Sequence, residues 1–405
     1  MRDPIRIVTF STLYPNAVQG THGVFVENRL RHLVGSDKVS ARVVAPVPWF
    51  PFGGAAFGRY GQFARTPSRE TRFGIDIVHP RYPVLPKIGM NTAPLSLYAF
   101  VKPVLARLIR NGGDFDLLDA HYFFPDGVAA VMLGRALGKP VTITARGTDI
   151  NFIPRHPVPR RMIRWAAERA DGLITVSAAL KEELVGLGVP PERVCILRNG
   201  VDLKIFRPIP PQQAKDALAV NGPVLASAGS LIERKGHDLV IRALEHLPKV
   251  TLLIAGQGPE RAALARLAAA IGAENRVRFL GSIPHERLRE IYSAADALVL
   301  ASSREGWPNV LLESMACGTP VIASNAWSAP EIIKAPEAGV LLQDRTAGAI
   351  VSAARALLAA PPRREATRAY AQRFSWQETT EGQVDLFSRI LRPASAVMSV
   401  PQVFP

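Results

Sequence analysis

The feature of this 405-residue sequence that most constrains its fold is an alternation of short apolar segments with helical patterns, which occurs twice along the chain. In the first series the apolar segments are rich in β-branched residues, as strands are. The predicted strands are 5–10, 40–47, 115–121, 141–146, 172–177 and 193–198. Helical patterns lie between several of them, at 24–34, 127–137 and 161–170.

The alternation starts again after the sequence NGVD at 199–202. Its predicted strands are 224–230, 250–256, 276–281, 297–302 and 320–324, and its predicted helices are 237–247, 260–271, 285–294, 310–316 and 347–358. Such alternation is typical of parallel sheets covered on both faces. The predicted fold class is therefore α/β, with two doubly wound, Rossmann-like domains that face a central cleft, where ligands bind at the carboxyl ends of the strands.

Three stretches depart from the alternation. Residues 48–68 and 80–94 are rich in proline, glycine and aromatic residues, so we expect mobile surface loops there. Residues 393–405 follow the last helical pattern and are expected to form a loose tail.

Composition excludes several classes of protein. The hydrophobic content of 48% and charged content of 20% are those of a chain with a sizeable core, not of a disordered one. The two cysteines, Cys195 and Cys317, match no metal or redox spacing, which favours buried thiols in a reducing cytosol. No run approaches the roughly 20 apolar residues of a spanning helix, and residues 1–15 lack the apolar region of a secretion signal. We expect a cytoplasmic protein.

The positive charge is concentrated in the first half of the chain. The net charge is +15, and residues 1–200 hold 26 lysines and arginines against 15 acidic residues. Nucleic acid, an anionic membrane surface or phosphorylated small molecules are the partners that such a charge suits. The basic residues are scattered, and the tightest group, at 159–170, reads as an amphipathic helix, so nucleic acid is not expected.

Two carboxylates lie at the end of the predicted strand 297–302. Glu305 falls in the loop that follows, and Glu313 falls about one turn into a helix that Pro308 and Asn309 are suited to start, with Asn309 as N-cap. A helix N-terminus there offers N–H groups to a phosphate. The carboxylates are suited to accept hydrogen bonds from hydroxyls of a ribose or a sugar ring. The alternative is that Glu313 only stabilises the first helical turn.

Two cations follow the first strand of the second series. Arg234 and Lys235 lie in the loop before a helix that opens after Gly236. A compact ammonium and a planar guanidinium together suit a diphosphate, whereas the alternative is an ordinary solvated basic turn.

A glycine pair, Gly256-x-Gly258, follows the next strand and resembles a dinucleotide loop. The third glycine of that pattern is replaced by Arg261, and no acidic ribose ligand follows at the usual place. The pair therefore indicates a tight turn beside a nucleotide better than a nicotinamide site.

The first half carries its own candidates at strand ends. Gly20 and Gly23 precede a helix, where backbone can approach a phosphate. His121 ends a strand just before a Pro-Asp-Gly turn, a better place for a ligand or proton contact than most histidines have. Arg146 and Asp149 repeat this arrangement in the sequence RGTD.

These segments together resemble the family 4 nucleotide-sugar glycosyltransferases, which have the two-domain GT-B fold. The matching segments are the Gly23 loop, HYFFPDG, RGTD, RNGVD, GSLIERKG, AGQGPE, FLGSIPHERLREIYSAADALVLAS and EGWPNVLLESMACGTPVIAS. The form EGWPNV is similar to transferases that make bacterial cell-surface polysaccharides, including those of the teichuronic-acid type. The resemblance implies domains at 1–203 (acceptor side) and 204–373 (nucleotide-sugar side), and a closing helix at 374–392 that packs back on the first.

The resemblance also implies roles for the donor site. Glu305 would hold hydroxyls of the donor sugar, Glu313 the ribose, and Arg234 with Lys235 the leaving diphosphate. Backbone N–H groups at the helix start would assist, those of Asn309, Val310 and Leu311.

On the other side, Gly23 would let backbone approach the diphosphate, and His121 would touch the transferred sugar or the acceptor hydroxyl. Arg146 and Asp149 are further candidates on the acceptor side. Where many family members have a glycine-rich stretch this chain has NAWSAPEI, in which Trp327 would narrow the pocket.

The activity implied is retaining hexosyl transfer from a UDP- or GDP-linked sugar to a glycan or polyprenyl-diphosphate-linked acceptor, in the synthesis of bacterial envelope polysaccharide. Asp114-Phe-Asp116 imitates a metal-binding motif but starts a strand instead of ending one, so no metal and no other cofactor are expected. An anionic membrane on the cytoplasmic side suits the basic first half. The alternatives are a nucleotide-sugar-binding protein without activity and, less favoured by the residues, a dehydrogenase. The oligomeric state is not predicted.

Overall fold

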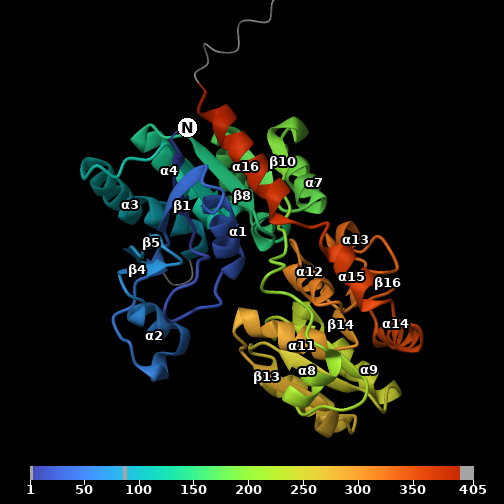
Figure 1. The fold of residues 1–405 in the computed structure, drawn as a ribbon. Helices are drawn as coiled ribbons and strands as arrows, with labels where there is room; N and C mark the ends of the chain where they lie inside the picture. The colour runs from blue at the N-terminus through green and yellow to red at the C-terminus, as the bar shows by residue number, and fades with distance from the viewer. Residues whose placement is uncertain (1–2, 85–88, 393–405) are drawn as a thin grey trace, which may run out of the picture. The chain divides into compact units, whose positions relative to one another are not determined.

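The computed structural model describes residues 3–84 and 89–392, which form two compact units (Figure 1). The first unit comprises Met1–Val176, Leu180–Arg198 and Gln377–Pro405, and the second comprises Ser177–Ala179 and Asn199–Trp376. The predicted tail, 393–405, lies outside the described residues.

The first unit is built on an eight-stranded sheet with the order β10-β9-β8-β7-β1-β2-β5-β4. All neighbours pair in parallel except β4 and β5. The strands are β1 (Ile5–Phe10), β2 (Val39–Val44), β4 (Arg69–Arg72), β5 (Ile75–Val78), β7 (Leu117–His121), β8 (Val141–Ala145), β9 (Gly172–Thr175) and β10 (Val194–Ile196). A small separate pair joins β3 (Val47–Pro48) to β6 (Arg81–Tyr82). The strand order reverses between β1 and β7, so ligands are expected where these two strands end.

Helices accompany this sheet in the first unit, and one of them, α2, contacts the separate strand β3. They are α1 (Val24–Val34), α2 (Gly58–Arg65), α3 (Gly89–Arg110), α4 (Val128–Leu137), α5 (Thr148–Asn151), α6 (Pro157–Arg169), α7 (Ala178–Gly186) and α16 (Trp376–Ile390). Val384 and Phe387 of α16 belong to the core cluster that contains Ile7, Leu30 and Leu117. This confirms that the C-terminal helix packs on the first domain (Figure 1).

The second unit has a six-stranded, wholly parallel sheet. Its strands are β11 (Val224–Ala228), β12 (Thr251–Ala255), β13 (Val277–Gly281), β14 (Ala297–Leu300), β15 (Val321–Ser324) and β16 (Gly339–Leu342). Counted from β11, the order is the 3-2-1-4-5-6 of a doubly wound sheet. Its helices are α8 (Pro211–Ala217), α9 (His237–Ala243), α10 (Arg261–Ala270), α11 (Leu288–Ala294), α12 (Asn309–Ala316), α13 (Ala329–Ile332), α14 (Ala347–Ala359) and α15 (Arg364–Ala371).

The predicted loops at 48–68 and 80–94 are wrong in part. The first contains α2, and the second contains β6 and the start of the 22-residue α3, while 85–88 lie outside the described residues. Pro94 and Pro103 lie inside α3, where each removes one intrahelical hydrogen bond, so the proline content misled the prediction. The strands β4, β5 and β16 were also not predicted.

The expectation that no segment is long and apolar enough to span a membrane is wrong for α3, which among the described residues is the one helix that is so by length and composition. Leu97, Val101 and Leu105 line its inner side and are fully buried in the first unit. The buried side of α3 thus packs within this unit, where the helix contacts α4 and α6.

Candidate functional site

Three predicted donor-site residues meet at the switch point of the second sheet, where the adjacent strands β11 and β14 end. Lys235 Nζ donates to Glu305 Oε1 at 2.6 Å, and an Arg234 guanidinium nitrogen lies 3.7 Å from Glu305 Oε2. Arg234 also donates to the carbonyl of Arg304. The structure therefore brings the two cations and one carboxylate together although 70 positions separate them in the chain.

This cluster is mostly enclosed. The Glu305 side chain is 12% exposed and that of Lys235 15%. Burial by itself raises the pKa of Glu305, but the charges of Lys235 and Arg234 outweigh it, and the net pKa is lowered. Glu305 is therefore held as a carboxylate by the two cations.

Backbone contacts fix the two loops to each other. Ser303 N–H donates to Arg234 O at 2.9 Å. Gly236 has φ 68°, and a Cβ at this position would lie 2.2 Å from Ala301 O. Only glycine allows this approach, and through it the cation loop reaches the Glu305 loop.

The glycine pair after β12 serves the same packing. A Cβ on Gly256 would lie 1.8 Å from Gly229 O, and one on Gly258 would lie 2.3 Å from Leu231 O. Leu231 N–H donates to Gln257 O at 2.9 Å. The close contact between neighbouring loops therefore explains why glycine is needed at both positions, and a nicotinamide site is not required to explain them.

Glu313 has different partners. His285 Nε2 lies 2.8 Å from Glu313 Oε1, and Tyr292 O–H donates to Oε2 at 3.1 Å. Burial lowers the pKa of His285, but the Glu313 charge outweighs it and the net pKa is raised, which favours an imidazolium–carboxylate pair. Burial and Glu313 raise the pKa of Tyr292 well above its usual value. Sequence reasoning assigned neither partner to the site, although both lie in the family-like segment FLGSIPHERLREIYSAADALVLAS, because no spacing rule links that segment to Glu313.

The start of α12 differs from the prediction. The helix begins at Asn309 with Pro308 at the cap position, so Asn309 is not the N-cap. Its side-chain oxygen instead accepts from Asn199 Nδ2 at 3.2 Å. The Asn309 and Leu311 N–H groups donate to Trp307 O and Pro308 O. Of the three predicted phosphate-binding N–H groups, two are therefore already bonded, and Val310 N–H is the third of this first turn.

The predicted residues of the first unit meet at its own switch point. His121 is the last residue of β7 and is 1% exposed. An Arg146 guanidinium nitrogen lies 2.6 Å from its Nδ1, and Asp119 Oδ2 lies 3.1 Å from its Nε2. Burial lowers the pKa of His121 to about 4. The ring is therefore neutral near pH 7, with Nδ1 accepting from Arg146 and Nε2–H donating to Asp119.

Asp149 positions this arginine. Its carboxyl oxygens accept from the backbone N–H groups of Phe123, Arg146 and Gly147, at 2.6 to 3.1 Å. Burial raises the pKa of Asp149. Both Asp149 and His121 are buried among protein groups here, so their contact with a substrate stays a prediction.

A buried polar chain, which the sequence did not reveal, continues from His121 to the C-terminal helix. Gln383 of α16 donates to Asp119 Oδ2 at 3.0 Å and accepts from Arg29 Nε at 2.8 Å. Thr142 donates to the other oxygen of Asp119 at 2.7 Å. The closing helix is therefore hydrogen bonded to the carboxylate that orients His121.

Gly23 lies at the end of the loop that follows β1. Its φ is 73°, and a Cβ there would lie 2.3 Å from Leu13 O, so loop packing already requires glycine. Asp126 holds the start of this loop: it accepts from Thr12 N–H at 2.7 Å, and burial raises its pKa to about 8.

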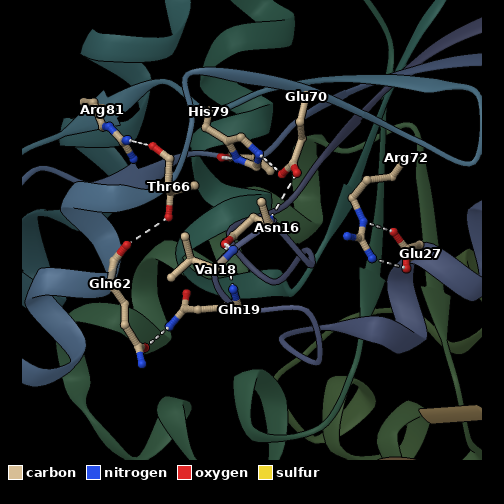
Figure 2. Close-up of polar contacts among 12 residues, drawn as sticks. Asn16, Val18, Gln19, Glu27, Gln62, Thr66, Glu70, Arg72, His79 and Arg81 are labelled. Carbon is tan, nitrogen blue, oxygen red and sulfur yellow. Dashed lines mark hydrogen bonds and ion pairs between the residues drawn. The ribbon is translucent and has the colours of Figure 1, made fainter. Parts of the chain in front are cut away.

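A hollow of about 130 Å³ lies between this loop and the ends of β2 and β6. Its polar lining includes Asn16, Gln19, His22 and His79. Figure 2 shows how the wall is held: Glu70 lies 2.7 Å from His79 Nε2, and Gln19 donates to Gln62 at 3.0 Å. Neither histidine was predicted as a site residue.

Asp114 and Asp116, the motif rejected as a metal site, form ion pairs with Lys139 and Arg6 at 2.8 and 2.5 Å. Within residues 3–84 and 89–392, no group of three or more histidine, cysteine or acidic side chains is arranged to hold a metal ion.

Comparisons with known proteins cover both halves of the chain. Residues 209–374 match the family model for glycosyl transferases group 1, and residues 83–205 match that for glycosyltransferase family 4. A D-inositol 3-phosphate glycosyltransferase of Mycobacterium bovis is 30% identical over 321 residues, which are 74% of this chain and 67% of that protein.

Solved structures show the same fold. Sucrose-phosphate synthase from Thermosynechococcus elongatus is similar with a TM-score of 0.76 and 22% identity, over 95% of this chain and 99% of that one. Anabaena Alr3699/HepE in complex with UDP-glucose is similar with a TM-score of 0.72 and 19% identity, over 95% of this chain and 100% of that one. The chain belongs to the family 4 glycosyltransferases, is a transferase, and has the GT-B fold.

Proposed function

We propose that this transferase moves a hexose from a nucleoside-diphosphate sugar, UDP- or GDP-linked, to a hydroxyl of a glycan or lipid-linked acceptor, with retention at the anomeric carbon and without a metal. The observation that carries this proposal is the cluster of Arg234, Lys235 and Glu305 at the switch point of the second sheet. HepE, which has the same fold, binds UDP-glucose.

The chemistry follows from the charges. As the bond between the anomeric carbon and the diphosphate breaks, negative charge grows on the departing oxygen and positive charge on the ring. Arg234 and Lys235 stabilise that oxygen, which lowers the barrier because the charge is larger in the transition state than in the bound donor. In a retaining transfer without an enzyme nucleophile, the acceptor oxygen bonds to the carbon on the face that the diphosphate leaves. Its proton then passes to the departing phosphate oxygen, the nearest developing base.

Glu305 has two roles in the proposed mechanism. In the structure it neutralises Lys235 and Arg234, which would otherwise be two like charges at a mostly enclosed site. When a diphosphate arrives and takes over the cations, the carboxylate becomes available for the sugar hydroxyls. Glu313, oriented by His285 and Tyr292, accepts from the ribose.

The acceptor is assigned to the first unit, at the hollow beside the β1 loop. Its amide and imidazole groups suit hydroxyl-rich molecules. The name of the mycobacterial relative and the basic character of residues 1–200 support a second candidate, a phosphorylated cyclitol. The first candidate, a glycan or lipid-linked acceptor, goes with a role in the synthesis of bacterial envelope polysaccharide and with the similarity to teichuronic-acid-type transferases. It also goes with a cytoplasmic location and peripheral attachment to an anionic membrane.

A thermal-shift screen against UDP-, GDP- and ADP-sugars tests the donor, because a ligand that binds only the folded state raises the melting temperature. Glu313→Ala is expected to abolish the shift, and Arg234→Ala to lower kcat more than it weakens donor binding. Product analysis with labelled donor then tests for transfer. A protein that binds a nucleotide sugar but neither transfers nor hydrolyses it would be the inactive binding protein instead.

The acceptor candidates are separated by offering inositol phosphate and a polyprenyl-diphosphate glycan side by side. Transfer to the first alone would refute the lipid-linked acceptor. Sedimentation with anionic vesicles at low salt tests the membrane attachment, which is abandoned if the protein stays in solution.

A further inference from the structure

The helices α3, α4 and α6 line an apolar hollow that is open at the surface of the first unit. Its volume is about 330 Å³. It is lined by Pro94, Leu95, Val128, Met132, Arg161, Met162 and Trp165. Arg161 is the one charged residue among these, so the hollow offers almost nothing that would fix the direction of a polar ligand.

One side of the hollow is a second apolar stripe on α6. Val158, Arg161, Met162 and Trp165 follow the spacing i, i+3, i+4, i+7, which places them on one face of the helix. The core is contacted by a different set, Pro159, Ile163, Ala166 and Ala167. The helix is thus apolar on two faces, and only one of them is used for packing in this unit.

On α3 this surface continues through Leu95, which lines the hollow and is 51% exposed. Large apolar side chains gathered on one exposed surface mark an interaction site more often than isolated ones do.

The charge around the hollow has one sign. Arg160, Arg161 and Arg164 are exposed on α6, and Arg155 is exposed just before it. α3 and α4 contain no acidic residue, and the single one on α6, Glu168, forms an ion pair with Arg169 at 2.8 Å. The surface, defined here as the α3–α6 face, therefore combines uncovered apolar side chains with arginines and favours an anionic partner.

We propose that the α3–α6 face docks on an anionic lipid bilayer, with lipid hydrocarbon entering the hollow beside Trp165 and the arginines contacting the headgroups. An indole ring prefers the boundary between headgroups and hydrocarbon, and arginine stems reach from apolar surface to phosphates. A flexible hydrocarbon chain suits a hollow whose lining lacks polar groups. The proposal rests on the peripheral membrane attachment in the proposed function and assigns it to these helices, not to the aromatic segment 48–68.

The test uses the full chain and two kinds of vesicle, phosphatidylcholine alone and phosphatidylcholine with 30% phosphatidylglycerol. We expect sedimentation only with the anionic vesicles, and release by high salt. Arg160→Glu/Arg164→Glu is expected to weaken binding by at least about tenfold, given the attraction of each basic residue to an anionic surface. The matched control, Lys249→Glu/Arg266→Glu, makes the same change of net charge on exposed positions of the second unit and is expected to bind as the wild type.

Two further measurements address the hollow itself. Leu95→Glu/Met162→Glu places charges at the hollow, and we expect it to weaken vesicle binding while the melting temperature and the nucleotide-sugar shift stay unchanged. Brominated lipid chains are expected to quench the fluorescence of the wild type, and Trp165→Phe to remove most of that quenching.

The outcomes separate the two levels of the proposal. If the wild type binds anionic vesicles and all variants bind equally well, the α3–α6 face is the wrong surface, although membrane attachment stands. If the arginine variant alone loses binding and Trp165 is not quenched, the hollow takes no hydrocarbon and that part is refuted. If the wild type binds no vesicle but forms a stoichiometric complex with an acidic protein that Leu95→Glu/Met162→Glu disrupts, the lipid assignment is overturned. None of these results affects the donor screen, which tests the transferase proposal separately.

Discussion

Replacing Lys235 by methionine tests the central electrostatic claim about the donor site. Methionine keeps most of the apolar stem and removes only the ammonium that lies 2.6 Å from Glu305. Removing one partner of a buried ion pair costs about 3–5 kcal/mol. Here Arg234 stays within 3.7 Å of the same carboxylate, and both side chains of the pair are slightly exposed, so we expect a loss of about 2 kcal/mol.

The melting temperature and its dependence on pH are the measurements. For a unit of about 180 residues, about 2 kcal/mol corresponds to a fall of roughly 4–8 °C. Because the pKa of Glu305 is lowered in the folded state, its contribution is fully present above the unfolded pKa of about 4.3 and is lost as the pH falls through the folded value. In the Lys235→Met variant the burial of Glu305 is no longer offset by the ammonium, so ionisation of this carboxyl costs more. The difference in the free energy of unfolding from the wild type should therefore be largest near pH 7 and shrink towards pH 3.

Arg287→Met is the matched control, since it breaks the exposed pair with Glu290 in the same unit. Exposed pairs contribute little, so this variant should melt as the wild type does. A Lys235→Met protein that melts within about 1 °C of the wild type at neutral pH would refute the reasoning, because the carboxylate would then not depend on the ammonium.

Other residues give further expectations. His285→Asn should raise the KM for the donor several-fold and leave kcat nearly unchanged, because it disturbs the orientation of Glu313; an equal fall in kcat would contradict this. The raised pKa of Asp126 keeps its carboxyl protonated in the folded state while the same group ionises in the unfolded chain, so the free energy of unfolding of the wild type should fall as the pH rises from about 4 to 8. Asp126→Asn should abolish this fall, and unfolding in denaturant at several pH values measures the free energy. Gln383→Leu should destabilise the first unit by about 1–3 kcal/mol, as it leaves the buried Arg29 and Asp119 groups without this partner; an unchanged denaturation midpoint would show that the bridge is dispensable.

The alternation of strands and helices was enough to predict two doubly wound sheets, but not their strand order. That order decides the site: β11 lies beside β14, and only for this reason do Lys235 and Glu305 meet. Sequence reasoning assigned the cations to a diphosphate and the carboxylate to a sugar, and did not predict that they pair with one another as the structure shows. The partners of Glu313 come from η8 (His285–Arg287) and α11, and no spacing rule links these to α12.

The misread segments have a common physical cause. Proline content was taken to exclude a helix at the start of α3, yet a long helix packed on its neighbours tolerates Pro94 and Pro103. The edge strand β4 has the sequence RETR, without the apolar alternation by which strands are recognised. In both cases tertiary packing outweighed local preference.

The return of α16 to the first unit has a consequence for biosynthesis. The ribosome releases the β1–β10 region long before residues 376–390, and until then that sheet lacks Val384, Phe387 and the amide that joins Arg29 to Asp119. The first unit therefore lacks the packing of α16 while the whole of the second unit is translated. At roughly 5–20 residues per second this takes of the order of ten seconds or more. A premature stop just before residue 376 would spare every donor-site residue and still leave the first unit without α16, so such a variant should behave as an assembly defect and not as a catalytic one.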